Sequence, residues 1–142
     1  MQTGKPRLIF RFLLVWRIWN TPAIAILSAA GWQFCSAGQN LGNGGWFGAF
    51  EGSKLVGSLG LYVENGVARY QSVGTHKKYR GRGIAGALLA FAAHSIAEQH
   101  KVDQFVIIAD QDSNAHRLYL KSEFDFHSTE HALMRAPQSD PD

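Results

Sequence analysis

The chain has 142 residues, of which 46% are hydrophobic, and its formal net charge is +3 with the histidines neutral. A chain of this length can bury one good core and no linker divides it, so we expect a single domain over residues 1–142. The small and local excess of positive charge argues against a nucleic-acid-binding protein. The lone cysteine, Cys35, excludes an internal disulfide framework and suits the reducing cytoplasm, and we expect its thiol to be buried.

The first 44 residues are atypical and carry the weakest local signals. The stretch Leu8–Trp19 is strongly apolar, but Arg11 and Arg17 interrupt it. It is therefore a poor transmembrane span and a poor signal peptide, and we expect no association with a membrane. Its first part, Leu8–Trp16, fits a strand. A Thr-Pro pair then predicts a helix over Thr21–Ala30.

Three strands are predicted in the middle of the chain, each separated from the next by a turn. The turns lie at Glu51-Gly52-Ser53 and at Glu64-Asn65-Gly66, and the second contains the Asn-Gly pair typical of tight hairpins. The predicted strands are Gly45–Phe50, Lys54–Val63 and Gly66–Val73. The pattern indicates an antiparallel meander.

A glycine- and arginine-rich turn follows, with the sequence Tyr-Arg-Gly-Arg-Gly-Ile-Ala-Gly over residues 79–86. Glycines let the main chain approach a ligand closely, and the helix that follows presents free N–H groups at the same point. This combination predicts a site for a phosphate or pyrophosphate. Arg80 and Arg82 are candidate contacts, whereas Lys77 and Lys78 fit a solvated loop.

Two common phosphate-binding motifs do not fit this turn. Gly81, Gly83 and Gly86 match the spacing G-x-G-x-x-G, but a basic run separates them from the preceding strand. The first acid after the predicted helix, Asp103, precedes the next strand, whereas a dinucleotide site needs an acid at that strand's end. A P-loop is excluded because no Gly-Lys-Ser/Thr follows.

Periodicity predicts the rest of the fold. Apolar residues recur at helical spacing over Gly83–Gln99, and Phe105–Ala109 is a β-branched apolar run typical of a buried strand. Asp112 or Ser113 can cap a second helix, and a final strand follows. The tail, residues 136–142, is polar and rich in proline, which predicts a frayed end. The sequence thus predicts an α/β fold, a single domain whose mixed, mostly antiparallel sheet is flanked by helices.

Two motifs resemble the GNAT superfamily of acyl-CoA-dependent N-acyltransferases. Arg80, Gly83 and Ala85 match its pyrophosphate motif, [Q/R]-x-x-G-x-[G/A]. The second helix resembles the family's N-x-x-A-x-x-L-Y-x-x-x-G-F, with matches at Ala115, Leu118, Tyr119 and Phe124. The resemblance covers roughly residues 45–135 and implies a GNAT-like acyltransferase fold.

The resemblance also implies a donor site for acetyl-CoA. Its pyrophosphate would lie on the glycine turn, and its pantetheine arm would pair with a strand that separates from its neighbour. The helix-start asparagine of the family aligns with Asp112, and Asn114 follows two residues later, so either could bond the arm. The implied contacts are Val73, Thr75, Arg80, Gly81, Arg82, Gly83, Ile84, Ala85 and Asn114.

The implied reaction is transfer of an acetyl group to a primary amine of a small molecule or peptide by direct attack. Tyr119 would protonate the departing thiolate, although from the residues alone a core aromatic is the simpler interpretation of Tyr119. Gln71 stands where the family often carries a glutamate base, so Glu64 and His76 are the substitutes. Loss of that base leaves an alternative, a non-catalytic acyl-CoA-binding or regulatory module. The histidines show no metal-ligand spacing, and the sequence leaves a homodimer open.

Overall fold

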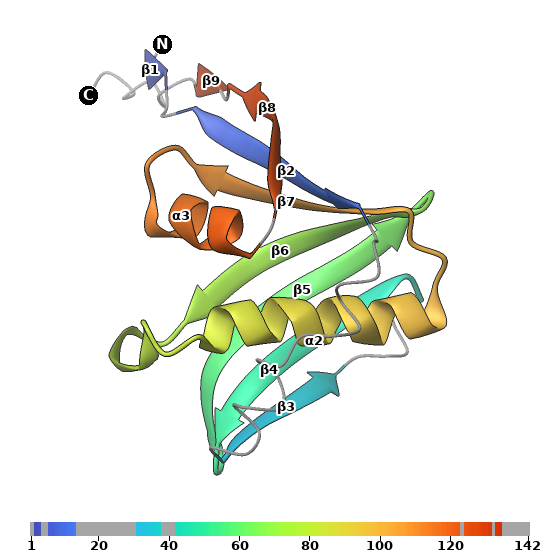
Figure 1. Cartoon of the computed structure of the whole chain (residues 1–142), viewed down its shortest axis with the longest axis vertical. Helices are drawn as coiled ribbons and strands as arrows, with labels where there is room; N and C mark the ends of the chain where they lie inside the picture. Colours follow the sequence, from blue (N-terminus) through green and yellow to red (C-terminus); the bar gives the residue numbers. More distant parts are fainter. Residues whose placement is uncertain are drawn as a thin grey trace, which may run out of the picture.

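The computed structural model describes residues 2–3, 6–13, 31–37, 42–122, 124–131 and 133–134. Figure 1 labels its elements in chain order. They are β1 (Gln2–Thr3), β2 (Arg7–Leu13), β3 (Trp32–Ala37), β4 (Gly44–Glu51), β5 (Lys54–Glu64), β6 (Val67–Thr75), the short 3₁₀ helix η2 (Lys77–Tyr79), α2 (Ile84–Gln99), β7 (Gln104–Asp110), α3 (Asn114–Lys121), β8 (Asp125–Glu130) and β9 (Leu133–Met134).

Seven of these strands form one sheet in the order β3-β4-β5-β6-β7-β2-β8, and β1 pairs separately with β9. Among the described strands of the large sheet, β6 and β7 run parallel and every other neighbouring pair is antiparallel. The helix α2 connects the parallel pair, as a crossover between parallel strands requires. The predicted α/β fold with a mixed, mostly antiparallel sheet is confirmed.

The meander of β4, β5 and β6 is built on the two predicted turns. Asn65 and Gly66 have φ angles of 49° and 78°, the left-handed pair that a tight Asn-Gly hairpin needs. Gly52 has a φ of 57° in the other turn. The predicted strands agree with β4, β5 and β6 to within two residues at each end.

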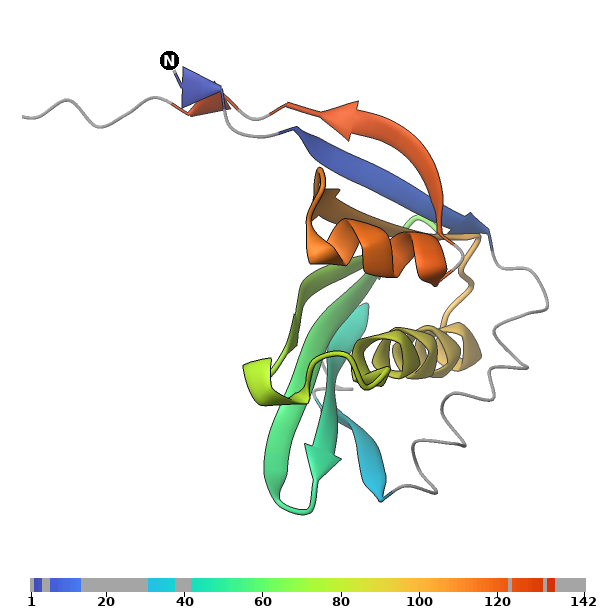
Figure 2. The same ribbon diagram turned by 60° about the vertical axis from the view of Figure 1, so that its left-hand side comes forward.

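The N-terminal strand β2 lies inside the sheet, between β7 and β8 (Figure 2). It pairs with β7 from Arg7 opposite Asp110 to Leu13 opposite Gln104. This is the first part of the strand expected over Leu8–Trp16. The remainder of that strand, the helix expected over Thr21–Ala30 and the tail expected to fray lie outside the described residues.

The edge strand β3 was not anticipated from the sequence, and it corrects the expectation for Cys35. Trp32 is buried and Phe34 is packed against the core, whereas Cys35 is exposed. Successive side chains of a strand point to opposite faces, so the alternation that buries Trp32 and Phe34 turns the cysteine outward.

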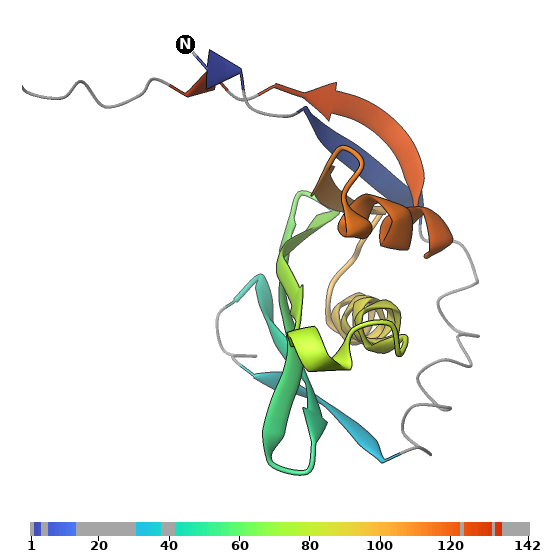
Figure 3. The same cartoon turned by 90° about the vertical axis from the view of Figure 1, so that its left-hand side faces the viewer.

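Both helices pack on the same face of the sheet (Figure 3). Ile84 and Leu88 of α2 are almost fully buried, and the ring of Tyr119 from α3 lies against Phe10 of β2. The most deeply buried large side chains are Phe10, Phe105, Leu59, Leu61, Ile84, Leu88, Ile107 and Val56. Within the described ranges, no helix is long and apolar enough to cross a membrane.

Candidate active site

The sheet splits where β6 and β7 diverge. The two strands pair at three positions, the last of which joins Arg69 to Val106. Beyond that pair β7 stays bonded to β2 as far as Asp110, so the β7-facing edge of β6 from Tyr70 to Thr75 has none of the described strands beside it. The expected separation of these strands is confirmed. Because α2 follows β6 and α3 follows β7, both helices begin at the open end of the split.

A β-bulge lies on β6 at the start of this open edge. Gly60 pairs with Gln71 and Ser58 pairs with Gly74, so Ser72 and Val73 together oppose the single residue Leu59. Ser72 has a φ of 50°, a left-handed conformation that is uncommon outside glycine. A bulge bends its strand and redirects the side chains that follow, and bulges are frequent beside active sites.

The glycine-rich turn brings the start of α2 to the same place. Gly81 and Gly83 have φ angles of 77° and 79°, and an added Cβ would meet no protein atom within 4 Å at either position. The first helical hydrogen bond is donated by the Ala87 N–H to the Gly83 carbonyl. The main-chain N–H groups that come before Ala87 at the start of α2 therefore have no acceptor within the helix, and they can bind an anion.

Of the four cations near this turn, Arg80 is the one that lines the split. Its Nε donates a hydrogen bond of 3.2 Å to the Thr75 carbonyl oxygen. The Arg82 guanidinium lies instead over the Tyr79 ring, 5.3 Å from its centroid, and Arg82 is not a lining residue. Lys77 and Lys78 are exposed and also lie off the lining.

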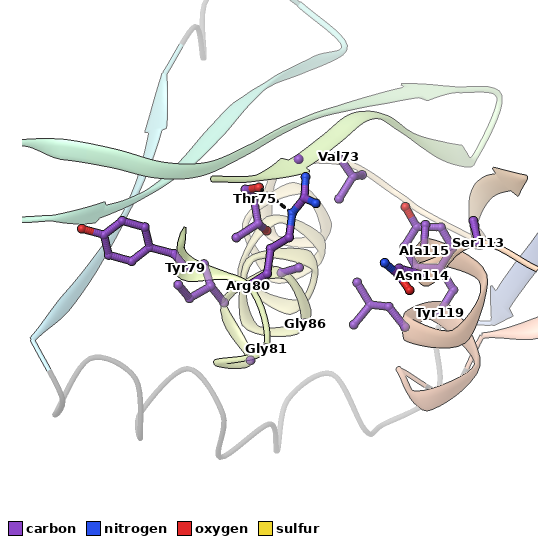
Figure 4. Close-up of a pocket in the computed structure, with 15 residues that line it drawn as sticks. Val73, Thr75, Tyr79, Arg80, Gly81, Gly86, Ser113, Asn114, Ala115 and Tyr119 are labelled. Carbon is purple, nitrogen blue, oxygen red and sulfur yellow. Dashed lines mark hydrogen bonds between the residues drawn. The ribbon is translucent and has the colours of Figure 1, made fainter. Parts of the chain in front are cut away.

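Together these elements enclose an open cleft with a volume of about 510 Å³. Figure 4 shows Val73, Thr75 and Arg80 on one side and the labelled residues of α3 on the other. The lining residues are Val73, Gly74, Thr75, Tyr79, Arg80, Gly81, Gly83, Ile84, Ala85, Gly86, Ser113, Asn114, Ala115, Leu118 and Tyr119. Among the described residues, no three His, Cys, Asp or Glu side chains gather closely enough to hold a metal ion.

The wall opposite β6 is the first turn and inner face of α3. Ser113 caps this helix, since its hydroxyl accepts a hydrogen bond from the His116 N–H at 3.1 Å. Asn114 points into the cleft with its amide oxygen 2.6 Å from a guanidinium nitrogen of Arg117, which donates to it. Asp112 does not line the cleft. Of the two alternatives that the sequence left open, Asn114 is the one that lines the cleft.

Tyr119 lies at the inner end of this wall. The residue is 3% exposed, and its ring packs against Phe10 and Phe124 at centroid separations of 6.2 and 6.1 Å. In the part of the chain that the structure describes, its hydroxyl has no hydrogen-bond partner and is not sealed from solvent, so it faces the cleft. Burial raises the pKa of Tyr119 to about 12. The phenol is therefore a neutral proton donor at physiological pH.

Neither of the two residues considered as bases, Glu64 and His76, lines this cleft, and nor does Gln71, which stands in place of the family's base. Glu64 ends β5 at the Asn-Gly hairpin, opposite Val67, and thus lies at the far end of β6 from Val73. The sequence suggested Glu64 from its nearness to β6 along the chain, but a strand separates its two ends by about 3.3 Å per residue. His76 caps η2 by accepting a hydrogen bond from the Lys78 N–H, and Gln71 is exposed beside the bulge.

Several lining residues carried no role in the sequence interpretation. Ser113 was considered only as a helix cap, and Gly74, Gly86 and Tyr79 were given no function. A signal for Ser113 was present, since a helix cap lies beside the free N–H groups of its own helix. The bulge that exposes Gly74 has no comparable signal in the sequence.

The comparison with family models decides the family. The model described as the acetyltransferase (GNAT) family matches residues 13–125, which is most of the chain. The chain belongs to the GNAT acetyltransferase family. A comparison of this GNAT chain with curated proteins gave no match.

Solved structures of the GNAT fold resemble this chain at low sequence identity. A GCN5-related N-acetyltransferase from Kribbella flavida has 14% identity and a TM-score of 0.66, with 90% of this chain and 57% of that chain covered. One from Sphaerobacter thermophilus has 16% identity and a TM-score of 0.66, with 90% and 50% covered. A GCN5-related N-acetyltransferase-like protein from Streptococcus suis has 11% identity and a TM-score of 0.70, with 92% and 60% covered. This GNAT chain thus spans half to three-fifths of their lengths.

Proposed function

We propose that this chain is an N-acetyltransferase that moves an acetyl group from acetyl-CoA to a primary amine of a small molecule or peptide in the reducing cytoplasm. One observation carries the proposal. The free N–H groups at the start of α2, the open edge of β6 and the hydroxyl of Tyr119 all face one cleft. An anion site, a row of main-chain hydrogen-bonding groups and a proton donor are what an acyl-CoA thioester needs.

The donor would be bound along the cleft from the glycine turn to Tyr119. The N–H groups of Gly81–Ala85 would hold the pyrophosphate, and the guanidinium of Arg80 would add a charge-assisted contact. The main-chain groups of Val73 and Thr75, left without a neighbouring strand, would pair with the pantetheine amides. The amide of Asn114 is the candidate contact from α3.

The chemistry would be direct attack. The amine nitrogen forms a bond to the thioester carbonyl carbon, and the carbon–sulfur bond breaks as the tetrahedral intermediate collapses. The main-chain N–H of Val73 is the candidate donor to the oxyanion. Tyr119 would give its proton to the departing thiolate, and the proton lost by the amine would pass to water. Positioning the amine against the thioester supplies much of the rate enhancement in such a mechanism.

A second function is favoured by the residues where a base would lie. Gln71 has an amide that accepts no proton at physiological pH, and Glu64 lies at the opposite end of β6. With the donor site intact and the base lost, the chain would be a non-catalytic acyl-CoA-binding or regulatory module.

Turnover of acetyl-CoA separates the two functions. Free thiol release is followed with a panel of small-molecule and peptide amines, and binding of CoA is measured on the same protein by calorimetry. Thiol release that depends on an added amine supports the enzyme. Tight CoA binding without turnover supports the regulatory module, and absence of CoA binding at millimolar concentration would exclude both.

A further inference from the structure

Tyr79 connects the glycine-rich turn to the tip of the β4–β5 hairpin, whose residues do not line the cleft. Its hydroxyl donates a hydrogen bond of 2.7 Å to the carboxylate of Glu51, at the tip of the β4–β5 hairpin. The ammonium of Lys54, from the same hairpin, lies 5.2 Å from the centre of the Tyr79 ring. The guanidinium of Arg82 lies 5.3 Å from it. Figure 4 shows the Tyr79 side chain directed away from the α3 side of the cleft.

Two further rings fix the orientation of the phenol. Trp32, at the start of β3, meets it edge to face at a centroid distance of 5.7 Å. His76 meets it in the same manner at 5.5 Å. Edge-to-face pairs and cation–π contacts each favour one ring orientation over others. Contacts from β3, from the β4–β5 hairpin and from the turn itself thus converge on one side chain.

Apart from the hydrogen bond from Arg80 to Thr75 and the His76 cap of η2, few contacts order the segment that Tyr79 holds. The η2 helix buries none of its residues, and Gly81 and Gly83 follow with left-handed main-chain conformations. Glycine loses more conformational freedom on ordering than any other residue. A ligand that bound a mobile turn would have to order it, and its affinity would fall by that cost.

We propose that Tyr79 is a positioning residue that holds the glycine-rich turn in its anion-binding shape, so that the β4–β5 hairpin controls the affinity for the acyl donor from outside the cleft. This inference rests on the proposed function for its ligand. It assigns Glu51 a role that its charge alone would not suggest, because a carboxylate near a phosphate site repels the ligand.

The charge of Glu51 and its hydrogen bond to Tyr79 should change the Kd for CoA in opposite directions, and this difference gives the decisive test. Glu51→Ala removes a negative charge near the pyrophosphate site, so an electrostatic effect alone would tighten CoA binding. Loss of the hydrogen bond that orders the turn predicts the opposite, a Kd for CoA that rises by roughly fivefold to tenfold. Tyr79→Phe keeps the ring and its contacts, removes the hydroxyl, and should raise the Kd by a similar factor.

The double variant and a control variant complete the binding series. Tyr79→Phe combined with Glu51→Ala should bind no more weakly than the weaker single variant, since both remove the same bond. Tyr62→Phe removes a hydroxyl from a half-buried tyrosine outside the cleft and should leave the Kd unchanged. In turnover, the loss should appear as a raised KM for acetyl-CoA in Tyr79→Phe. A purely structural role would lower Tm without changing any Kd.

Limited proteolysis tests the same inference without a ligand. Arg80 and Arg82 in the turn, and Lys77 and Lys78 in the adjoining η2, are all exposed, so trypsin can report the opening of this segment directly. Tyr79→Phe and Glu51→Ala should each accelerate cleavage within the turn several-fold, whereas Tyr62→Phe should not. Unchanged cleavage in both variants, or tighter CoA binding by Glu51→Ala, would overturn the inference. If the parent binds no CoA, the proposed function fails and the cleavage rates still decide the role of Tyr79.

Discussion

The phenol oxygen of Tyr70 donates a hydrogen bond of 2.7 Å to the main-chain carbonyl oxygen of Leu89. Tyr70 is the first residue of β6 beyond the last β6–β7 pair, and Leu89 lies in the second turn of α2. At the point where β6 loses its neighbouring strand, it is therefore tied to the helix whose N-terminus lines the cleft. This bond fixes the open edge of β6 relative to the free N–H groups of α2.

Removal of that hydroxyl should weaken the fold. We expect Tyr70→Phe to lower the free energy of unfolding by about 1 kcal/mol, the net value of a typical intramolecular hydrogen bond. Leu89 lies inside α2, so its carbonyl oxygen still accepts the intrahelical hydrogen bond after the substitution. The larger cost of leaving a buried polar group unpaired therefore does not apply. Urea unfolding measures the change, with Tyr62→Phe as the control. A Tyr70→Phe protein as stable as the parent would show that the bond contributes nothing.

The buried tyrosines also predict how stability changes at alkaline pH. Burial raises the pKa of Tyr119 to about 12 and raises the pKa of Tyr70 further. The unfolded chain, with ordinary phenol pKa values near 10, then loses these protons first. Stability should be constant up to about pH 10 and fall as the pH rises towards 12. The double variant Tyr70→Phe/Tyr119→Phe should lose less stability between pH 9 and pH 11.5 than the parent, as measured by urea midpoints. An equal loss in both proteins would contradict the assignment.

Gly83→Val and a matched control should separate two effects of a valine in the turn. One is the main-chain strain that lowers stability, and the other is the obstruction of the ligand that lowers CoA affinity. A β-branched residue at a φ of 79° is strained by about 1–2 kcal/mol, and its side chain would occupy the space beside the free N–H groups. We expect CoA binding to be nearly abolished in a protein that still folds. Gly42→Val is the matched control, because Gly42 also has a positive φ, of 73°, and open space but lies outside both the cleft and the β4–β5 hairpin. It should lose similar stability and bind CoA like the parent. Equal binding by both variants would place the pyrophosphate elsewhere.

Tyr119→Phe tests the proton donor. The ring and its packing against Phe10 and Phe124 remain, and only the hydroxyl is lost. If Tyr119 is the general acid, kcat for thiol release should fall by roughly 10²-fold or more, with CoA affinity and stability close to the parent. Tyr62→Phe should retain full turnover. A small change in kcat would assign Tyr119 to the core alone.

Gln71→Glu tests the regulatory alternative. Gln71 is exposed beside the bulge, where a carboxylate would be tolerated and could accept a proton from the amine directly or through water. If the chain lacks only its base, this substitution should raise amine-dependent thiol release at least tenfold over the parent, with an unchanged Kd for CoA. Gln33→Glu, on the exposed part of edge strand β3, is a control of equal charge. A similar gain in both variants would point to a general charge effect.

Sequence reasoning succeeded where the signal was local. The Asn65-Gly66 hairpin, the glycine turn before α2 and the apolar run of β7 each depend on a few neighbouring residues, and the structure has them as predicted. The same turn and the motif on α3 identified the residues that the structure brings together around the cleft.

The features that local sequence patterns do not report all depend on contacts between distant parts of the chain. The position of β2 depends on its pairing with residues about a hundred positions later, which no local pattern reports. The exposure of Cys35 follows from the register of an edge strand with its neighbour β4. Glu64 was suggested as a base because it is close to β6 along the chain. In the sheet it lies opposite Val67, and the length of β6 separates it from Val73. The contacts around Tyr79 join β3, the β4–β5 hairpin and η2, so they too appear only in three dimensions.

The position of β2 has a consequence for the order of folding. Leu13 pairs with Gln104, and the interior place of β2 between β7 and β8 cannot be filled until both of those strands exist. The meander of β4–β6 with α2 uses contacts much closer in sequence, so it can form first. Closing a loop of about ninety residues to insert β2 is entropically costly and slow. We therefore expect refolding to show an early phase for the half that carries the glycine turn and a later phase in which β2 completes the sheet and fixes the α3 wall.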